Sequence, residues 1–270
     1  MRYNIPPSLV RAYRGEDIVV RSRDSSDFPK SLSEADVKKV EYLQLLSLSG
    51  DTDCLARWGE KIPLDLVMTE PEKEFPLLYR FSRLLNKHPV RVSVPPVPGF
   101  SKAVKLAASL NFAVKIIGGQ PGTALNGEMT EVLNLYLRHP TVSQPIEYFH
   151  SLLLAFFHEK PVFLMTIQEE DPMYFRYITD QGQETISERF AAQGMIGESA
   201  IAMLTRQLPE ASEECPVCEF LPHCRGYFKW PERDYSCEGV KRMLGALKNA
   251  ARELKTDYVS FLERTGENKT

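Results

Sequence analysis

Apolar residues along much of the chain follow two alternating patterns. Short runs rich in Val, Ile and Leu are typical of strands, and each is followed by a run whose apolar residues recur every three or four positions, as on one face of a helix. The predicted strands are residues 40–46, 63–68, 90–94, 114–117 and 162–167, and the predicted helices are residues 74–86, 101–110, 129–138 and 146–158.

Strands that alternate with helices indicate successive β–α–β units and a parallel sheet buried on both faces. About five or six such units fit between residues 36 and 170, fewer than the eight of a closed barrel. The sequence therefore predicts an α/β fold, either a partial (β/α) barrel or an open doubly wound sheet.

The two ends of the chain differ from this middle part. Two short β-type runs within residues 9–23 surround the turn Arg14-Gly15-Glu16-Asp17 and predict an N-terminal hairpin. Beyond residue 170 the pattern predicts a hairpin over 173–183, a helix around 199–207 and an amphipathic helix from residue 239. The expected division is a hairpin extension at 1–35, the partial barrel at 36–170 and a small subdomain at 171–270.

Charge and hydropathy exclude several classes of protein. The 33 Lys and Arg residues against 36 Asp and Glu give a net charge of -3, which argues against a nucleic-acid binder. No apolar stretch has the length of a membrane span, and the first residues lack the apolar core of a signal peptide. We expect a cytoplasmic protein with neither a nucleic-acid nor a membrane partner.

The cysteines are the strongest chemical signal. Of five in the chain, Cys215, Cys218, Cys224 and Cys237 lie close together, whereas Cys54 stands alone. Clustered thiols in a chain without an export signal favour a metal centre over disulfides. Two thiolates separated by two residues can bind one centre from a tight turn, and the other two complete a four-thiolate set for zinc or an iron-sulfur cluster.

The spacing of these cysteines resembles the auxiliary-cluster segment of the SPASM domain, which follows the barrel of radical S-adenosylmethionine enzymes that mature peptides and cofactors. The resemblance covers residues 170–254 and includes Thr179-Asp180-Gln181-Gly182, similar to the turn before the family's cluster region, and Cys224-Arg225-Gly226. It implies that the four cysteines bind one [4Fe-4S] cluster. Phe228 stands where the family has a further cysteine, so only one cluster is implied.

The same resemblance implies a partial barrel and a limit on the chemistry. The family's first strand is followed by a C-x3-C-x2-C loop that binds the cluster which cleaves S-adenosylmethionine. The stretch after the predicted strand 40–46 contains only Cys54, so S-adenosylmethionine is not expected as a cofactor. The chain then resembles an accessory or partner protein of peptide or cofactor maturation, with a protein or peptide partner. The alternative is a non-catalytic interaction module stabilised by one Zn²⁺.

Other features have two interpretations each. Cys54 is either a helix residue packed beside Leu55 or a reactive or ligating thiol, and His223 is either a packing residue or a donor beside the metal. The segment 118–122 is either an ordinary loop or a phosphate cradle, and the acids 169–171 are either a solvated turn or part of a barrel-mouth site. The aromatic residues among 227–235 either shield the metal centre or form a docking face.

Overall fold

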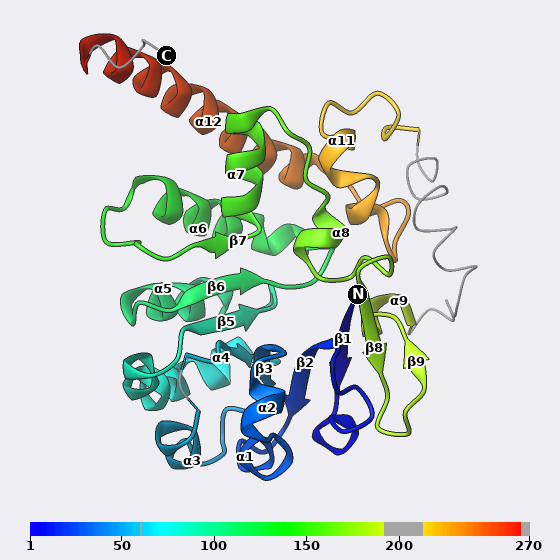
Figure 1. Cartoon of the computed structure of the whole chain (residues 1–270). Coiled ribbons are helices and arrows are strands. Elements are labelled where there is room, and N and C mark those ends of the chain that lie inside the picture. The colour runs from blue at the N-terminus through cyan, green and yellow to red at the C-terminus, as the bar shows by residue number, and fades with distance from the viewer. Residues whose placement is uncertain (60, 192–212, 266–270) are drawn as a thin grey trace.

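The computed structural model describes residues 1–59, 61–191 and 213–265. They form an α/β fold around a nine-stranded sheet in the order β7-β6-β5-β4-β3-β2-β1-β8-β9 (Figure 1). All neighbouring strands are parallel except β8 and β9, which are antiparallel. The sheet is open, because its two end strands do not pair with each other.

The strands are β1 (Arg2–Ile5), β2 (Asp17–Ser22), β3 (Val40–Leu45), β4 (Leu64–Val67), β5 (Val90–Val94), β6 (Ala113–Ile116), β7 (Ile146–Glu147), β8 (Phe175–Ile178) and β9 (Glu184–Thr185). The α-helices are α1 (Asp27–Ser31), α2 (Glu34–Val37), α3 (Asp53–Arg57), α4 (Pro71–Glu74), α5 (Phe100–Ser109), α6 (Asn126–Arg138), α7 (Phe149–His158), α8 (Leu164–Ile167), α9 (Glu188–Ala191), α11 (Leu221–Cys224) and α12 (Glu238–Thr265). The 3₁₀ segments are η1 (Pro7–Leu9), η2 (Phe75–Asn86), η3 (Thr123–Leu125) and η5 (Tyr227–Lys229). Among the described residues, none of these helices is both long and apolar enough to cross a membrane.

Four of the five predicted strands are confirmed to within two residues, and the fifth is wrong. Residues 164–167 form helix α8, with Leu164 and Met165 in the core. A short apolar run does not by itself distinguish a strand from a buried helix. Here the left-handed backbone of Glu169, with φ of 60°, turns the chain back toward the sheet directly after the helix.

The predicted N-terminal hairpin is also wrong. Only the second of its two runs is a strand, β2, and its partner is β1, which lies upstream and runs parallel to it. The first run follows η1 in an irregular connection in which Val10 is buried. The hairpin predicted over 173–183 is confirmed by the antiparallel pair β8 and β9. The helix predicted around 199–207 lies outside the described residues.

Strand residues alternate between an apolar and a polar face of the sheet. Buried Leu43, Leu66 and Val92 belong to the hydrophobic core that also includes the helices. The neighbouring positions in the strands are polar, as in Gln44, Asp65 and Arg91. The prediction of a sheet buried between two apolar layers therefore holds for one face only, and the other carries a network of polar side chains.

Candidate functional site: a four-cysteine pocket

The four clustered cysteines meet at one pocket between α11 and the start of α12. Cys215, Cys218, Cys224 and Cys237 all line it, as the sequence predicts. Apolar side chains complete the wall, among them Phe220, Leu221, Phe228, Val240 and Leu244. Among the described residues, no three His, Cys, Asp or Glu side chains are close enough together to hold a single metal ion.

Local backbone structure explains why these thiols come together. The amide of Cys218 donates to the carbonyl of Cys215 at 3.0 Å, which closes a turn around Pro216 and Val217. Cys224 is the last residue of the short helix α11, and Cys237 immediately precedes α12. The turn, the short helix and the long helix each supply part of the set.

Backbone amides near Cys224 reduce the cost of a negatively charged sulfur there without offsetting its burial. Arg225 and Gly226 both have left-handed backbones, with φ of 47° and 77°. The backbone N–H groups of Phe228, Gly226 and Tyr227, which follow Cys224 along this segment, act to lower the pKa of its thiol. Successive amides that converge on one point form an anion-binding concavity, and a metal-bound thiolate is such an anion.

The thiols themselves are costly to ionise in this site. Burial raises the pKa of Cys224 to about 11 and that of Cys237 to about 12, and it also raises the pKa of Cys215. A desolvated thiolate requires a nearby positive charge, and a bound metal supplies one while displacing the proton. The pocket therefore combines hydrogen-bond donors for thiolates with an environment that does not ionise free thiols.

A buried lysine adds positive charge beside the pocket. Lys229 lines the wall, and its ammonium group donates to the carbonyl of Tyr235 and pairs with Glu214. Glu214 also pairs with Lys241 at 2.7 Å. Hydrogen bonds from Lys229 and Lys241 lower the pKa of Glu214 to about 2. Glu214 directly precedes the first cysteine of the motif, and this position is the one sequence signal that could have identified it.

The pocket is fastened to the open sheet through the loop after β6. Gln120 donates to the carbonyls of Phe228 at 3.0 Å and Glu232 at 2.7 Å, and the Tyr235 hydroxyl donates to Pro121 at 2.9 Å. The segment 118–122 is thus packed against the cysteine-bearing segment, which favours its interpretation as a structural loop.

A second set of contacts connects the pocket to Glu170. The hydroxyl of Tyr227 donates to the Glu170 carboxylate at 2.8 Å, and Arg189 pairs with the same carboxylate at 3.3 Å. The Arg189 guanidinium also donates to the carbonyl of Tyr227 at 2.7 Å and lies over its ring. Gly119 leaves room for it, since a Cβ there would overlap the guanidinium.

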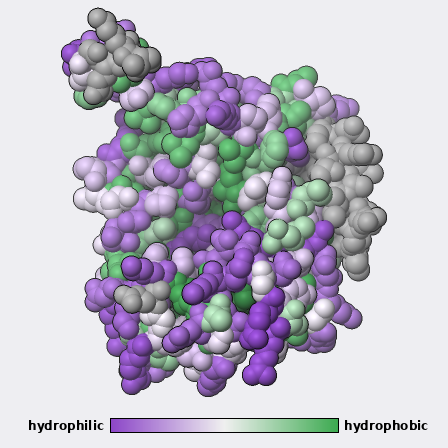
Figure 2. Space-filling view, viewed as in Figure 1, coloured by the Kyte–Doolittle hydropathy of each residue, from purple (hydrophilic) through white to green (hydrophobic). Residues whose placement is uncertain are grey.

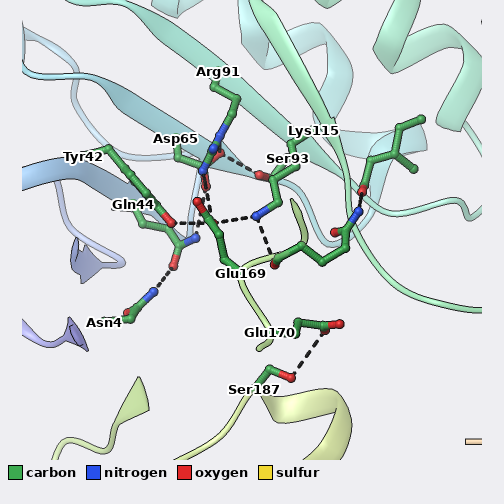
Figure 3. Close-up of polar contacts among 12 residues, drawn as sticks. Asn4, Tyr42, Gln44, Asp65, Arg91, Ser93, Lys115, Glu169, Glu170 and Ser187 are labelled. Carbon is green, nitrogen blue, oxygen red and sulfur yellow. Dashed lines mark hydrogen bonds and ion pairs between the residues drawn. The ribbon is translucent and has the colours of Figure 1, made fainter. Parts of the chain in front are cut away.

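A second cluster of charged and polar side chains lies on the polar face of the sheet (Figure 3). Asp65 accepts hydrogen bonds from Arg91 at 3.0 and 3.2 Å, from Ser93 at 2.6 Å and from Gln44 at 3.1 Å. Glu169 pairs with Lys115 at 2.6 Å and accepts from the Tyr42 hydroxyl at 2.7 Å. Glu169 and Glu170 therefore belong to networks of charged and polar side chains and not to a solvated turn.

The charges of this network neutralise one another. Burial raises the pKa of Asp65, but the charge of Arg91 and the hydrogen bonds from Arg91 and Ser93 outweigh it and leave that pKa lowered. Glu169 behaves in the same way, with Lys115 and Arg91 as the charges that lower its pKa. The sequence signal for this network is the polar residue at every second position of β3 to β6, which the apolar runs alone do not reveal.

Cys54 and His223 have separate surroundings. Cys54 lies in α3, does not line the cysteine pocket, and its sulfur is 3.2 Å from the Ser25 hydroxyl. The ring of His223 packs edge-on against Phe156 and accepts from the Val162 amide at 3.4 Å. Burial lowers the pKa of His223, so the neutral ring is favoured there.

The stretch after Val40–Leu45, which the resemblance matches to the family's first-strand loop, has a different place in the structure. Two strands precede Val40, so the first parallel strand of the sheet is β1. The segment that follows β1, residues 6–16, contains no cysteine either.

Comparison with known proteins gives one informative match. No family model matches the chain, and no curated protein matches it. A solved structure titled native anSMEcpe with bound AdoMet is similar in fold, with a TM-score of 0.52 and 15% identity, over 90% of this chain and 86% of that chain. At this identity the likeness concerns the fold alone.

Proposed function

We propose that this protein binds one [4Fe-4S] cluster through Cys215, Cys218, Cys224 and Cys237. In this proposal it serves as an accessory or partner protein in the maturation of a peptide or cofactor, without cleaving S-adenosylmethionine itself. The observation that carries the proposal is that all four cysteines line one pocket.

The residues of the pocket fit an iron-sulfur cluster. Thiolates are the usual ligands of such clusters, and amide hydrogen bonds to their sulfurs together with a dry apolar wall are features that tune cluster potential. The amides directed at Cys224 and the surrounding Phe and Leu side chains are of this kind. A four-thiolate set also suits a single zinc ion, so metal analysis has to distinguish the two groups.

A bound cluster would supply one-electron transfer close to the surface. Val217, at the tip of the turn between the first two cysteines, is 86% exposed and offers a partner an apolar contact beside the cluster. The charges of Lys229, Lys241 and Glu214 are next to the same pocket. This arrangement supports exchange of electrons with a protein or peptide partner that docks over the turn.

The small number of cysteines near the first strands supports the accessory role. In the resemblance to radical S-adenosylmethionine enzymes, cleavage requires three thiolates after the first strand. The segments after β1 and after β3 together offer only Cys54. The fold likeness to an AdoMet-bound protein makes AdoMet the compound to test. We expect the iron-loaded protein with dithionite and AdoMet to form no 5′-deoxyadenosine.

The deciding experiment is anaerobic purification followed by iron, sulfide and zinc analysis, with an absorption spectrum of the same sample. We expect about four irons and four sulfides per chain and a broad band near roughly 400 nm. Cys224→Ser should lose most of the iron, while the matched variant Cys54→Ser should keep all of it. One zinc and no sulfide would contradict the proposal and support the zinc-stabilised interaction module.

A further inference from the structure

The long helix α12 carries a continuous apolar seam. Its members are separated alternately by four and three residues, which is the spacing of a coiled-coil seam. They are Val240, Leu244, Leu247, Ala251, Leu254, Tyr258 and Phe261.

Only the first part of this seam is covered by the rest of the molecule. The seam residues up to Ala251 are buried, and α12 packs mainly against α7, with further contacts to α6. Leu254, Tyr258 and Phe261 are 48%, 53% and 50% exposed. Helix α7 ends at His158, and the contact of Phe157 with the Tyr258 ring, at 6.2 Å between centroids, lies near the end of the packing.

The end of α12 stands clear of the body, as both views of the molecule show (Figures 1 and 2). An apolar stripe that leaves the core in register with its buried part is unusual on an isolated surface helix. The same spacing that packs the first half against α7 continues on the exposed half. The exposed half therefore presents a seam suited to another helix.

We propose that the exposed seam, Leu254, Tyr258 and Phe261, pairs with the same seam of a second copy of this chain, with the two helices antiparallel. The charged residues beside the seam favour a second copy in the antiparallel orientation. Asp257 and Arg264 are seven residues apart, so they lie on the same edge of the seam. Antiparallel pairing about a two-fold axis brings Asp257 of each copy near Arg264 of the other.

A parallel pair lacks this complementarity. In that arrangement the residue that approaches Asp257 across the seam is Leu262, which carries no charge. Within the described part of the chain, neither Asp257 nor Arg264 takes part in an ion pair. The two-fold arrangement gives both charges a partner, twice in each dimer.

The mass of the full chain in solution tests this inference. In sedimentation velocity we expect the mass to rise with concentration from 30.7 kDa toward twice that value. Phe261→Asp should raise the dissociation constant at least about tenfold, because it places a charge at the centre of the seam. The matched variant Val259→Asp, at a site 45% exposed but off the seam, should change it little. A wild-type chain that stays monomeric at every concentration would overturn the proposal.

Charge exchange tests the antiparallel orientation. Asp257→Arg should weaken the dimer, since it places Arg opposite Arg264 of the second copy. The double variant Asp257→Arg with Arg264→Asp should restore the wild-type dissociation constant. If the double variant is weakened at least as much as the single one, the antiparallel pairing is wrong. Iron analysis of each variant keeps this result separate from the proposed cluster.

Discussion

The polar face of the sheet and the cysteine pocket solve the problem of buried polar groups in opposite ways. On the sheet, Asp65 and Glu169 find their counter-charges within the protein, in Arg91 and Lys115. In the pocket, the thiols have raised pKa values and their immediate wall is largely apolar. The first region is electrostatically complete in the chain alone, whereas the second is, in our proposal, completed by a bound group.

Dependence on a bound group should therefore appear at the pocket and not at the sheet. Removing one charged partner from the sheet network leaves the other buried without its counter-charge, so we expect a lower free energy of unfolding. Removing a cysteine from the pocket leaves no buried charge in the free protein, so we expect a lower metal content and a smaller change in stability. Substitutions in each region and acidification test this separation, and the largest effect is expected at Asp65.

Asp65→Ala should lower the free energy of unfolding by about 3–5 kcal/mol, because it removes the nearer of the two carboxylates that pair with Arg91 and leaves Ser93 without its acceptor. Urea denaturation at neutral pH measures this change. The matched control is Lys39→Ala, which removes an exposed pair with Asp17 and should cost less than about 1 kcal/mol. Similar costs for the two variants would show that the sheet network does not stabilise the fold.

Acidification should reveal the same network with a smaller effect, since protonation leaves each side chain in place. The folded pKa values of Asp65 and Glu169 are lowered, so their stabilisation is fully present above the unfolded pKa values, near roughly 4. It is lost as the pH falls through the folded values. Denaturation measured from pH 7 to pH 3 should show this loss, and Glu169→Gln should flatten it. An unchanged slope in that variant would contradict the assignment.

Gly119→Ala tests the connection between the two regions. A Cβ at this position displaces the Arg189 guanidinium, which then loses its hydrogen bonds to the carbonyls of Tyr227 and Trp230. We expect a loss of about 1–3 kcal/mol in the free energy of unfolding. Gly122→Ala, where nothing lies within 4 Å of the added atom, is the matched control and should be close to neutral.

Cys54→Ser should have the smallest effect. Its sulfur contacts the Ser25 hydroxyl, and serine keeps a hydrogen-bonding group at that place. We expect a change within about 0.5 kcal/mol and an unchanged iron content. Loss of iron in this variant would show that the lone cysteine belongs to a metal site after all.

The sequence alone predicts four of the parallel strands, β3 to β6, and the proximity of the cysteines, and particular residues show why the rest does not follow from it. Close spacing along the chain limits how far apart Cys215, Cys218 and Cys224 can be, so proximity follows from sequence. The pairing of β1 with β8 depends on residues far apart in the chain, such as Arg2 and Phe175, and no local pattern encodes it.

The sheet network illustrates a different reason. The overall apolar character of strands such as Leu64–Val67 and Val90–Val94 predicts burial on both faces and hides the polar residues at their alternate positions. Because successive side chains of a strand point to opposite faces of the sheet, polar residues at alternate positions mark one face as polar. The strand pattern does not predict that Glu169 joins this network, because Glu169 lies outside the strands, at a turn with a left-handed backbone.

The position of β1 has a consequence for how the protein folds. This strand precedes the other described strands in the chain, yet it lies inside the sheet, between β2 and β8. Its second edge stays open until residues 175–178 have been synthesised, and an open strand edge is a place where other chains can add. A growing chain therefore exposes this edge to aggregation until β8 has emerged, and β1 is paired on both sides only once the distant β8 is in place.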